Sequence, residues 1–580
     1  MKNTIILGLN AYHGDSSACL LKNGEVLCAF EEERFTRYKH WAGFPYYSIK
    51  NCLDEVGLDI SEIDYITISR DPKYNFGKKV IFSLMNPILL YNSVNRLING
   101  YKIATLEKEF YKHFNLSSSQ FKSKIKYIEH HSSHLASAFF ASPFYKSAIL
   151  SIDAFGDFSS TVLAFGEGNK ITKIEEVNFP HSLGQFYTAC TQYLGFHNYG
   201  DEYKVMGLAP YGKPIYLDEI SKILVLQKNG LFKLNLKYFT HHISGVQTKI
   251  MEKNDPTPSL FFSDEFEVLL GPKRIPGGEL TQYHKDIAAS VQLHCENAIF
   301  HLVNRVHSFV GGDNLCIAGG CAQNSVANGK ISSNTNFSNI YIPPAGHDAG
   351  TSIGSALYLY NQILGFERKP AMLNPYLGSF SENSEIEKLL IEREIDYQYY
   401  NDDDLFRLVA GYLVDGCVVG WFQGRAEFGP RALGGRSILV DPRRSDAKDL
   451  LNSKIKRRES FRPFAPSILK EYVSDYFEIV DGVPFMEKVF PIKKDKRELI
   501  PAVTHVDGTG RLQTVDYSVS PKYYSLINEF YKLSGTPILL NTSFNENEPI
   551  VNKPSEALDC YLRTSMDVLV LGNYIVKRIN

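Results

Sequence analysis

The chain has 580 residues, of which 44% are hydrophobic and 22% charged, with a formal net charge of −2 at pH 7. This length and composition predict at least two folded domains, and the balanced charge argues against bulk electrostatic binding to nucleic acid or membranes. The nine cysteines are scattered without a CxxC pair, which disfavours a disulfide framework or zinc ribbon and predicts a reducing, cytoplasmic location. We expect no signal peptide or membrane span, because the apolar runs are short or interrupted.

Two segments of the first half share one pattern. Residues 5–33 (IILGLNAYHGDSSACLLKNGEVLCAFEEE) and 148–177 (AILSIDAFGDFSSTVLAFGEGNKITKIEEV) each begin with a buried-type strand, then a small or polar turn, a second strand, a Gly-containing turn and a third strand. A first turn with Asp and Ser can present backbone N–H groups to a phosphate. The pattern predicts one β-hairpin unit used twice. The alternative is two similar hairpins without a shared role.

Three histidines lie within five positions in "KYIEHHSSHLASAFF". The segment predicts a short strand, KYIE, and then a helix from about His130. On a helix His130 and His134 share a face, whereas His131 points about a quarter turn away. One interpretation is a buried, hydrogen-bonded pair of imidazoles. The other is two ligands of one metal ion, which needs a third ligand, expected to be acidic.

A third segment, "NLCIAGGCAQNSVANGKI", predicts an apolar strand, a Gly-Gly turn and a helix starting near Ala322. Gly319 and Gly320 would allow close backbone approach, and a helix N-terminus favours an anion or a ribose phosphate. Two phosphate-type hairpins followed by such a loop resemble the actin, sugar-kinase and heat-shock ATPase superfamily.

Asp348 follows in "IYIPPAGHDAGTSIGSALY", just before a helix rich in Gly and Ala. Taken alone, this position favours a helix-capping role for its side chain. Together with the His pair, Asp348 is the best candidate for the acidic metal ligand.

The second half of the chain places basic residues in loops rich in Gly and Pro. Arg431 and Arg462 lie beside Pro in small or apolar surroundings, which favours phosphate binding by their planar guanidinium groups. Arg457 and Arg458, in "KIKRRES", are interpreted as a solvated helix face. The candidate phosphate-binding residues are Arg425, Arg431, Arg436, Lys456, Arg462 and Arg511.

Long motifs in a fixed order carry a family resemblance over nearly the full length. The chain resembles the O-carbamoyltransferases of the nodulation protein NodU and tobramycin carbamoyltransferase type. The motifs are GLNAYHGDSSACLLKNGEVLCAFEEERFTRYKH, EHHSSHLASAF, DEYKVMGLAPYG, GGCAQN, GRAEFGPRALGGRSILVDPR, ESFRPFAPS, THVDGTGRLQTV and GTPILLNTSFNENEPIV.

The resemblance implies an α/β protein with two catalytic domains. Residues 1–365 would form a duplicated, actin-like ATPase-fold domain similar to the tRNA threonylcarbamoyl-transfer enzymes. Residues 366–375 would be a linker, and residues 376–580 a YrdC-like α/β domain that forms carbamoyl-adenylate.

For the first domain the resemblance implies a metal ion, Fe²⁺ or another divalent transition metal, held by His130, His134 and Asp348. His131 would lie behind the ligands or near the nucleotide. The adenylate would be bound by Asp153, Gly319, Gly320 and Asn324.

His13, at the tip of the first hairpin, is the candidate base for the acceptor hydroxyl, and Lys39 is a candidate cationic group facing the carbamate. Either could instead be an ordinary turn or surface residue. Some family members read His-Asp directly, whereas this chain reads His13-Gly14-Asp15. This departure leaves the catalytic role assigned to Asp15 open.

The implied chemistry starts from carbamoyl phosphate and ATP with Mg²⁺ in the second domain, where Asn541 and Ser543 would join the basic residues. Carbamate would attack the α-phosphate of ATP, pyrophosphate would leave, and the carbamoyl-adenylate formed would pass to the first domain. There the hydroxyl of a small acceptor (a sugar, a natural product or a nucleoside or nucleotide) would take the carbamoyl group and AMP would leave.

Two rival functions are weighed against this one. A tRNA threonylcarbamoyl-type transferase usually has only the first domain, and the charge gives no tRNA footprint. A non-catalytic actin- or chaperone-like ATPase would leave the Arg-rich half unexplained. The aromatic-rich segments 66–125 and 213–285 are expected to set acceptor specificity or to form an interface, for example of a homodimer.

Overall fold

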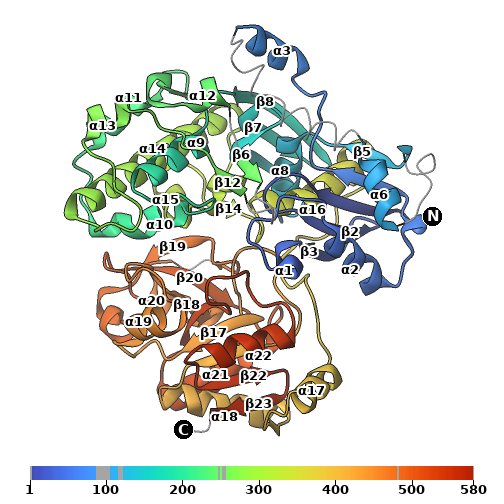
Figure 1. Cartoon of the computed structure of the whole chain (residues 1–580), viewed down its shortest axis with the longest axis vertical. Helices are drawn as coiled ribbons and strands as arrows, with labels where there is room; N and C mark the ends of the chain where they lie inside the picture. The colour runs from blue at the N-terminus through green and yellow to red at the C-terminus, as the bar shows by residue number, and fades with distance from the viewer. Residues whose placement is uncertain are drawn as a thin grey trace. The chain divides into compact units, whose positions relative to one another are not determined.

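The computed structural model shows an α/β protein with mixed sheets (Figure 1). It describes residues 3–85, 105–114, 122–245, 248–250, 256–479 and 482–578. Within these ranges no helix combines the length and the apolar character that a membrane crossing requires.

Two compact units make up the chain. The first contains residues 1–327 and 331–372, and the second contains residues 328–330 and 373–580. The division after Met372 falls inside the segment 366–375 that the sequence predicted as the linker.

A five-stranded sheet opens the first unit, in the order β3-β2-β1-β4-β5. β1 and β2 are antiparallel, as are β2 and β3, whereas β4 lies parallel to β1 and β5 parallel to β4. The strands are β1 (Ile5–Asn10), β2 (Ser17–Lys22), β3 (Glu25–Glu31), β4 (Tyr65–Ile68) and β5 (Ile125–Tyr127).

The second sheet of this unit repeats the topology, in the order β14-β13-β6-β7-β8. Its first three strands along the chain are antiparallel neighbours, and its last two are added in parallel to the first. The predicted hairpin repeat is therefore present as part of two sheets with one topology. The strands are β6 (Lys146–Gly156), β7 (Ser159–Glu167), β8 (Lys170–Asn178), β13 (Asn314–Ala318) and β14 (Asn339–Tyr341).

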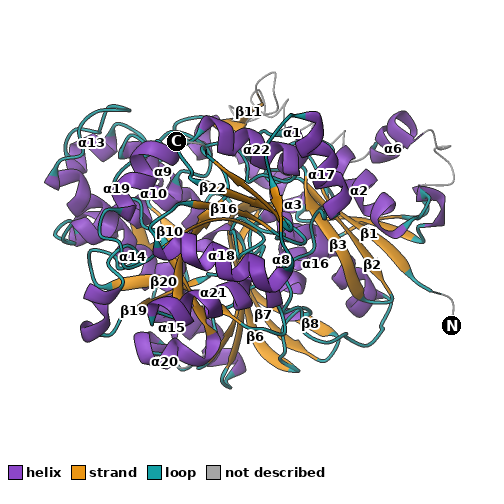
Figure 2. Ribbon diagram, turned by 90° about the horizontal axis from the view of Figure 1, so that it is seen from below, coloured by secondary structure: helices purple, strands orange, loops and turns teal. Residues whose placement is uncertain are grey.

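Two helices lie between these sheets, α8 (His130–Phe139) and α16 (Thr351–Leu357) (Figure 2). Every residue of both helices is buried. The Glu129 side chain caps α8 by accepting from the backbone N–H groups of His131 (2.9 Å) and Ser132 (2.7 Å). At the crossing, a Cβ on Gly354 would lie only 1.8 Å from the carbonyl oxygen of Ser133, so the two backbones touch there.

Further helices and short strands complete the first unit. The helices are α1 (Glu33–Thr36), α2 (Tyr46–Val56), α3 (Phe76–Met85), α6 (Leu106–Phe114), α9 (Leu183–Tyr193), α10 (Glu202–Leu208), α11 (Leu217–Ile223), α12 (His241–Ser244), α13 (Glu265–Leu270) and α14 (Gln282–Val310), and α15 spans Ser325–Asn334. The short strands are β9 (Leu224–Leu226), β10 (Phe232–Leu234), β11 (Thr248–Ile250) and β12 (Pro256–Pro258).

In the second unit the described strands form one sheet, in the order β15-β23-β22-β16-β17-β21-β18-β20-β19. Helices cover both of its faces, so the central strand β16 is buried throughout. Trp421 packs against α18 and α21 on one face, and the next residue, Phe422, packs into the core of the other face.

The strands of this sheet are β15 (Gln398–Tyr399), β16 (Val419–Phe422), β17 (Arg436–Val440), β18 (Ala465–Leu469), β19 (Lys488–Pro491), β20 (Thr509–Val515), β21 (Ile538–Ser543), β22 (Val568–Leu571) and β23 (Tyr574–Lys577). The helices are α17 (Asn383–Glu392), α18 (Asp402–Val414), α19 (Ala447–Leu450), α20 (Val473–Tyr476), α21 (Pro521–Ser534) and α22 (Pro554–Arg563).

The contact between α8 and α16 gives a stability prediction. We expect Gly354→Ala to destabilise the first unit by about 1–3 kcal/mol, because the added methyl group overpacks a backbone contact. Scanning calorimetry measures the effect. The matched control is Gly77→Ala in α3, where a Cβ meets nothing within 4 Å and alanine favours the helix. Equal thermal stability of the two variants would contradict the proposed close contact.

Candidate functional site

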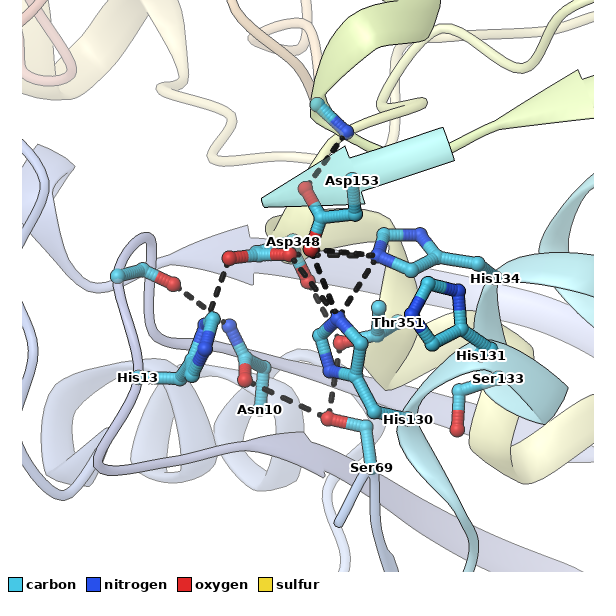
Figure 3. A network of polar contacts seen from close by, with 12 residues as sticks. Asn10, His13, Ser69, His130, His131, Ser133, His134, Asp153, Asp348 and Thr351 are labelled. Carbon is cyan, nitrogen blue, oxygen red and sulfur yellow. Dashed lines mark hydrogen bonds and ion pairs between the residues drawn. The ribbon is translucent and has the colours of Figure 1, made fainter. Parts of the chain in front are cut away.

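Four buried side chains of the first unit converge on one point: His130, His134, Asp153 and Asp348 (Figure 3). One potential ligand atom of each lies within 4.8 Å of the others. The Nε2 atoms of the two histidines are 3.1 Å apart, Asp153 Oδ2 lies 3.1 Å from His130 Nε2, and Asp348 Oδ1 lies 3.3 Å from His134 Nε2. Two imidazoles and two carboxylates are a donor set that suits a divalent transition metal.

The four side chains come from three separate elements of the first unit. His130 and His134 occupy one face of α8, Asp153 lies near the end of β6, and Asp348 begins the 3₁₀ turn that leads into α16. The side chain of Asp348 makes no helix-capping hydrogen bond. Its Oδ1 atom is buried without a hydrogen-bond partner. Buried polar atoms seldom lack a partner, and a metal ion would supply one here.

Asp153 lies beside the histidines, and the adenylate-binding role that the sequence assigns to it stays a prediction. Its Oδ2 atom faces the imidazoles, and its Oδ1 atom accepts from the backbone N–H of Gly320 at 3.0 Å. The repeat contained the signal that was missed, since Asp153 occupies the position that Asn10 occupies in the first hairpin. Asn10 donates to the carbonyl oxygens of Gly14 and Asp15, and so orders its own turn.

Opposite charges inside the cluster shift the pKa values of His134 and Asp153. Burial alone would lower the pKa of His134, but its contacts with Asp153 and Asp348 raise it to about 9. Burial would raise the pKa of Asp153, whereas the contacts with His130 and His134 hold it well below its usual range. The carboxylates therefore keep a proton on His134, and a bound metal ion would take the place of that positive charge.

His131 lies beside the cluster. Its Nδ1 atom is 2.8 Å from the hydroxyl of Ser151, and its ring makes an edge contact with the ring of His130, with centroids 5.4 Å apart. Burial lowers the pKa of His131 to about 4, so the imidazole is neutral and packs against the His130 ring.

The first hairpin brings His13 to the same place. His13 Nδ1 lies 2.6 Å from Asp348 Oδ2, and its ring centroid is 5.1 Å from that of His130. Asp15 points elsewhere and pairs with His40 at 2.8 Å. Lys39 is exposed, and its catalytic role stays a prediction.

The Gly-Gly turn differs in detail from the prediction. Residues Gly320–Gln323 form a 3₁₀ turn, and α15 begins only at Ser325, because Asn324 is the N-cap and its side chain accepts from Ala327 N–H at 3.1 Å. A Cβ on Gly319 would lie 2.2 Å from the carbonyl oxygen of Ile152. The adenylate-binding role of Gly319, Gly320 and Asn324 stays a prediction.

The second unit contains a cationic cluster. Burial lowers the pKa of Arg431 to about 10, with no carboxylate offsetting it. Burial and the charges of Arg431, Arg458 and Arg462 lower the pKa of Arg511. Guanidinium groups that repel one another in a buried setting form a site for an anion, which relieves the repulsion.

Arg458 corrects the prediction of a solvated helix face. Its Nε atom donates to Asn452 Oδ1 at 2.8 Å, and its guanidinium lies 4.7 Å from the ring centroid of Phe464. Arg462 contributes to the same cluster, and its nearest acidic atom is that of Glu459 at 3.6 Å. Arg425 donates to the carbonyl oxygen of Leu377 at 3.2 Å, and its phosphate-binding role stays a prediction.

Arg436 lies in the interior of the second unit, and its phosphate-binding role stays a prediction. Its side chain is fully buried, and its guanidinium carbon lies 3.6 Å from the ring centroid of Phe422. Its two Nη groups hold the loop before β17 together. They donate to the carbonyl oxygens of Ser379, Gln423, Gly424 and Gly435.

Lys456 and Asn541 are likewise buried and support the loops around the site. Lys456 Nζ donates to the backbone and side-chain oxygens of Asn545, both at 2.7 Å, and to the carbonyl oxygen of Ser543. Asn541 Nδ2 donates to the carbonyl oxygen of Ala432 at 3.1 Å. The roles of Lys456, Asn541 and Ser543 in binding carbamoyl phosphate or ATP stay predictions.

Comparison with known proteins identifies the family of the chain. A family model of the carbamoyltransferase N-terminus matches residues 5–357, and one of the carbamoyltransferase C-terminus matches residues 410–578. An uncharacterised protein of Synechocystis is 43% identical over 99% of this chain and 97% of its own length. The nodulation protein NolNO of Sinorhizobium fredii is 38% identical over 98% of this chain and 80% of its own.

Solved structures are more distant. Component A of (R)-2-hydroxyglutaryl-CoA dehydratase from Acidaminococcus fermentans aligns at 13% identity with a TM-score of 0.34, over 62% of this chain and 99% of that one. This likeness is too weak to assign a fold. The two family models, and the relatives that match almost the whole chain, show that the chain belongs to the carbamoyltransferase family of enzymes.

Proposed function

We propose that the protein is an ATP-dependent O-carbamoyltransferase that works through a carbamoyl-adenylate. The second unit makes this intermediate from carbamoyl phosphate and ATP, and the first unit transfers its carbamoyl group to the hydroxyl of a small acceptor. The observation that carries the proposal is the opposite chemistry of the two units. One contains a cationic cluster suited to phosphates, and the other a buried His–carboxylate cluster suited to a metal ion.

The fold supports this division of labour. Two sheets of one topology fit a duplicated, actin-like ATPase fold for the first unit. The mixed sheet of the second unit, with Arg431 in the loop before β17 and Arg511 on β20, fits a YrdC-like domain that binds nucleotide and carbamoyl phosphate.

In the second unit carbamoyl phosphate is hydrolysed to carbamate and phosphate. A carbamate oxygen then attacks the α-phosphate of ATP, the bond to the β-phosphate breaks, and pyrophosphate leaves with that electron pair. Arg431, Arg462 and Arg511 offset the negative charge of these phosphates, and Mg²⁺ is expected with ATP. The orphaned Nε–H of Arg511 provides a donor for such an anion.

In the first unit His130, His134, Asp153 and Asp348 would hold Fe²⁺ or another divalent transition metal. When bound, such an ion acts as a Lewis acid towards a carbonyl or phosphoryl oxygen. His13 takes the proton of the acceptor hydroxyl. Its contact with Asp348 fixes the ring beside the cluster.

The half-reaction of the second unit can be tested without an acceptor. Purified protein with ATP and carbamoyl phosphate is expected to release pyrophosphate, and Arg431→Ala is expected to slow this release about 100-fold or more, because a buried cation at the phosphates is lost. The control is Arg407→Ala, an exposed arginine paired with Asp404 on α18. ATP hydrolysis that ignores carbamoyl phosphate would instead favour an actin-like ATPase.

The role of Asp153 separates metal binding from adenylate binding. We expect Asp153→Asn to lower the affinity for Fe²⁺ or Zn²⁺ about 10- to 100-fold, because one carboxylate ligand becomes a neutral amide. Metal content after dialysis, measured by mass spectrometry, reports this without any turnover. A variant with full metal content and impaired AMP binding would return Asp153 to the adenylate site.

Gly156 tests the position of one ligand. A Cβ there would lie 1.9 Å from His130 Cδ2, so Gly156→Ala must displace the imidazole. We expect metal content to fall while the folded structure, followed by circular dichroism, is kept. Gly77→Ala serves again as the control with open space around the new methyl group. Unchanged metal content in Gly156→Ala would argue against His130 as a ligand.

A further inference from the structure

Two loops of the first unit are joined beside the His–carboxylate cluster. The loop between β1 and β2 and the loop after α1 exchange backbone contacts, from Tyr12 N–H to Gly43 O at 3.1 Å and from Ser16 N–H to Trp41 O at 2.9 Å. The Ser16 hydroxyl also donates to Gly43 O at 2.9 Å. The loops therefore behave as one rigid element.

This element holds an Asp–His pair that the proposed function does not use. Asp15 Oδ1 lies 2.8 Å from His40 Nδ1, and the backbone N–H of His40 donates to Glu33 Oε2 at 2.8 Å. Asp15 and His40 both have a positive φ, 57° and 56°, in the left-handed region that residues other than glycine seldom adopt. Strained positions that the surroundings impose in this way tend to occur at functional sites.

The outer nitrogen of His40 is left open. Within the described part of the chain His40 Nε2 has no hydrogen-bond partner, and the side chain is 30% exposed. A Cβ on Gly200 would lie 2.5 Å from this atom, so the glycine keeps the space next to Nε2 free. A carboxylate on Nδ1 and an open Nε2 are the arrangement by which an imidazole is oriented towards a ligand.

Tyr199 connects this pair with the His–carboxylate cluster. Its ring centroid is 5.1 Å from that of His40, and a Cβ on Gly14 would lie 2.5 Å from its hydroxyl. Burial and then the charges of Asp348, Asp15 and Asp153 raise the pKa of Tyr199 well above its usual range. Tyr199 thus contacts the His40 ring and is influenced by the carboxylates of both the cluster and the Asp–His pair.

The charge of His40 indicates what it binds. Burial would lower its pKa, but Asp15 and Glu33 raise it to about 9 against the opposing charge of Lys39. The charge of His40 in turn acts on Glu202, whose pKa burial raises, and Tyr199 is neutral. The imidazole is therefore a cation at neutral pH that offers an N–H. In the transfer reaction the anionic group is the phosphate of the carbamoyl-adenylate.

We propose that His40, oriented by Asp15, binds the adenylate phosphate in the first unit through Nε2–H and stabilises AMP as it leaves. The inference deepens the proposed function and rests on it. The acceptor oxygen forms a bond to the carbamoyl carbon, the bond from that carbon to the phosphate oxygen breaks, and AMP departs with the electron pair. The proton of the hydroxyl goes to His13. This gives Asp15 of the His-Gly-Asp sequence a positioning role.

AMP and adenosine binding test the contact without knowledge of the acceptor. Calorimetry is performed on metal-loaded, full-length protein that carries Arg431→Ala, so that nucleotide binding at the cationic cluster is removed. We expect His40→Asn to weaken AMP binding about 10- to 100-fold, as for a hydrogen bond to a charged group, and to leave adenosine binding unchanged. Asparagine tolerates the left-handed conformation but is too short to reach the phosphate.

His113→Gln is the matched control, because His113 also pairs with a carboxylate, Glu109 at 3.5 Å, and is 28% exposed. Asp15→Asn should weaken AMP binding in the same sense as His40→Asn and more weakly. In the parent protein AMP affinity should fall as the pH rises through about 9, where His40 loses its proton, and His40→Asn should lack this dependence.

Unchanged AMP affinity in His40→Asn, or an equal loss for adenosine, would overturn the inference. The proposed function has a separate readout. Pyrophosphate release by His40→Asn in the otherwise native chain should match the parent, and its absence in both proteins would count against carbamoyl-adenylate formation itself.

Discussion

The first unit depends on the contact between α8 and α16. Gly354 lets the backbones of the two helices touch at Ser133, and this brings the histidines of α8 up to the turn that presents Asp348. Asp153 reaches the same point from the end of β6, where Gly156 leaves room for the His130 ring. The convergence of these four side chains is thus a result of backbone proximity, which small residues make possible.

The buried charged clusters of the two units differ in composition. In the first, buried carboxylates and imidazoles nearly balance each other, and a proton or a metal ion completes the balance. In the second, the charges of Arg431, Arg458 and Arg462 lower the pKa of the buried Arg511, and a bound anion would offset this repulsion. A metal ion in the first cluster or an anion in the second would neutralise buried charge. Both clusters are therefore arranged for ligand binding, at a cost in local stability.

Sequence reasoning succeeded where a short pattern fixes the geometry. The hairpin repeat gave two sheets of one topology, and the i, i+4 spacing placed His130 and His134 on one face. It could not anticipate burial. The Gly-rich loop predicts phosphate binding by Arg436, but it does not reveal that the loop folds around this side chain and that its Nη groups donate to backbone carbonyls. The roles of Asp153 and His40 depend on contacts between distant segments, which spacing along the chain does not reveal.

The equivalence of Asn10 and Asp153 has a wider consequence. They occupy the same position in the two copies of the hairpin, and their side chains differ by one amide in place of one carboxylate oxygen. One copy uses its side chain to shape a turn, and the other uses it to face the histidines. A repeated unit can therefore use one position for two tasks, because each copy carries the side chain that its own surroundings require. The first copy still reaches the cluster through His13, whose Nδ1 atom lies 2.6 Å from Asp348 Oδ2.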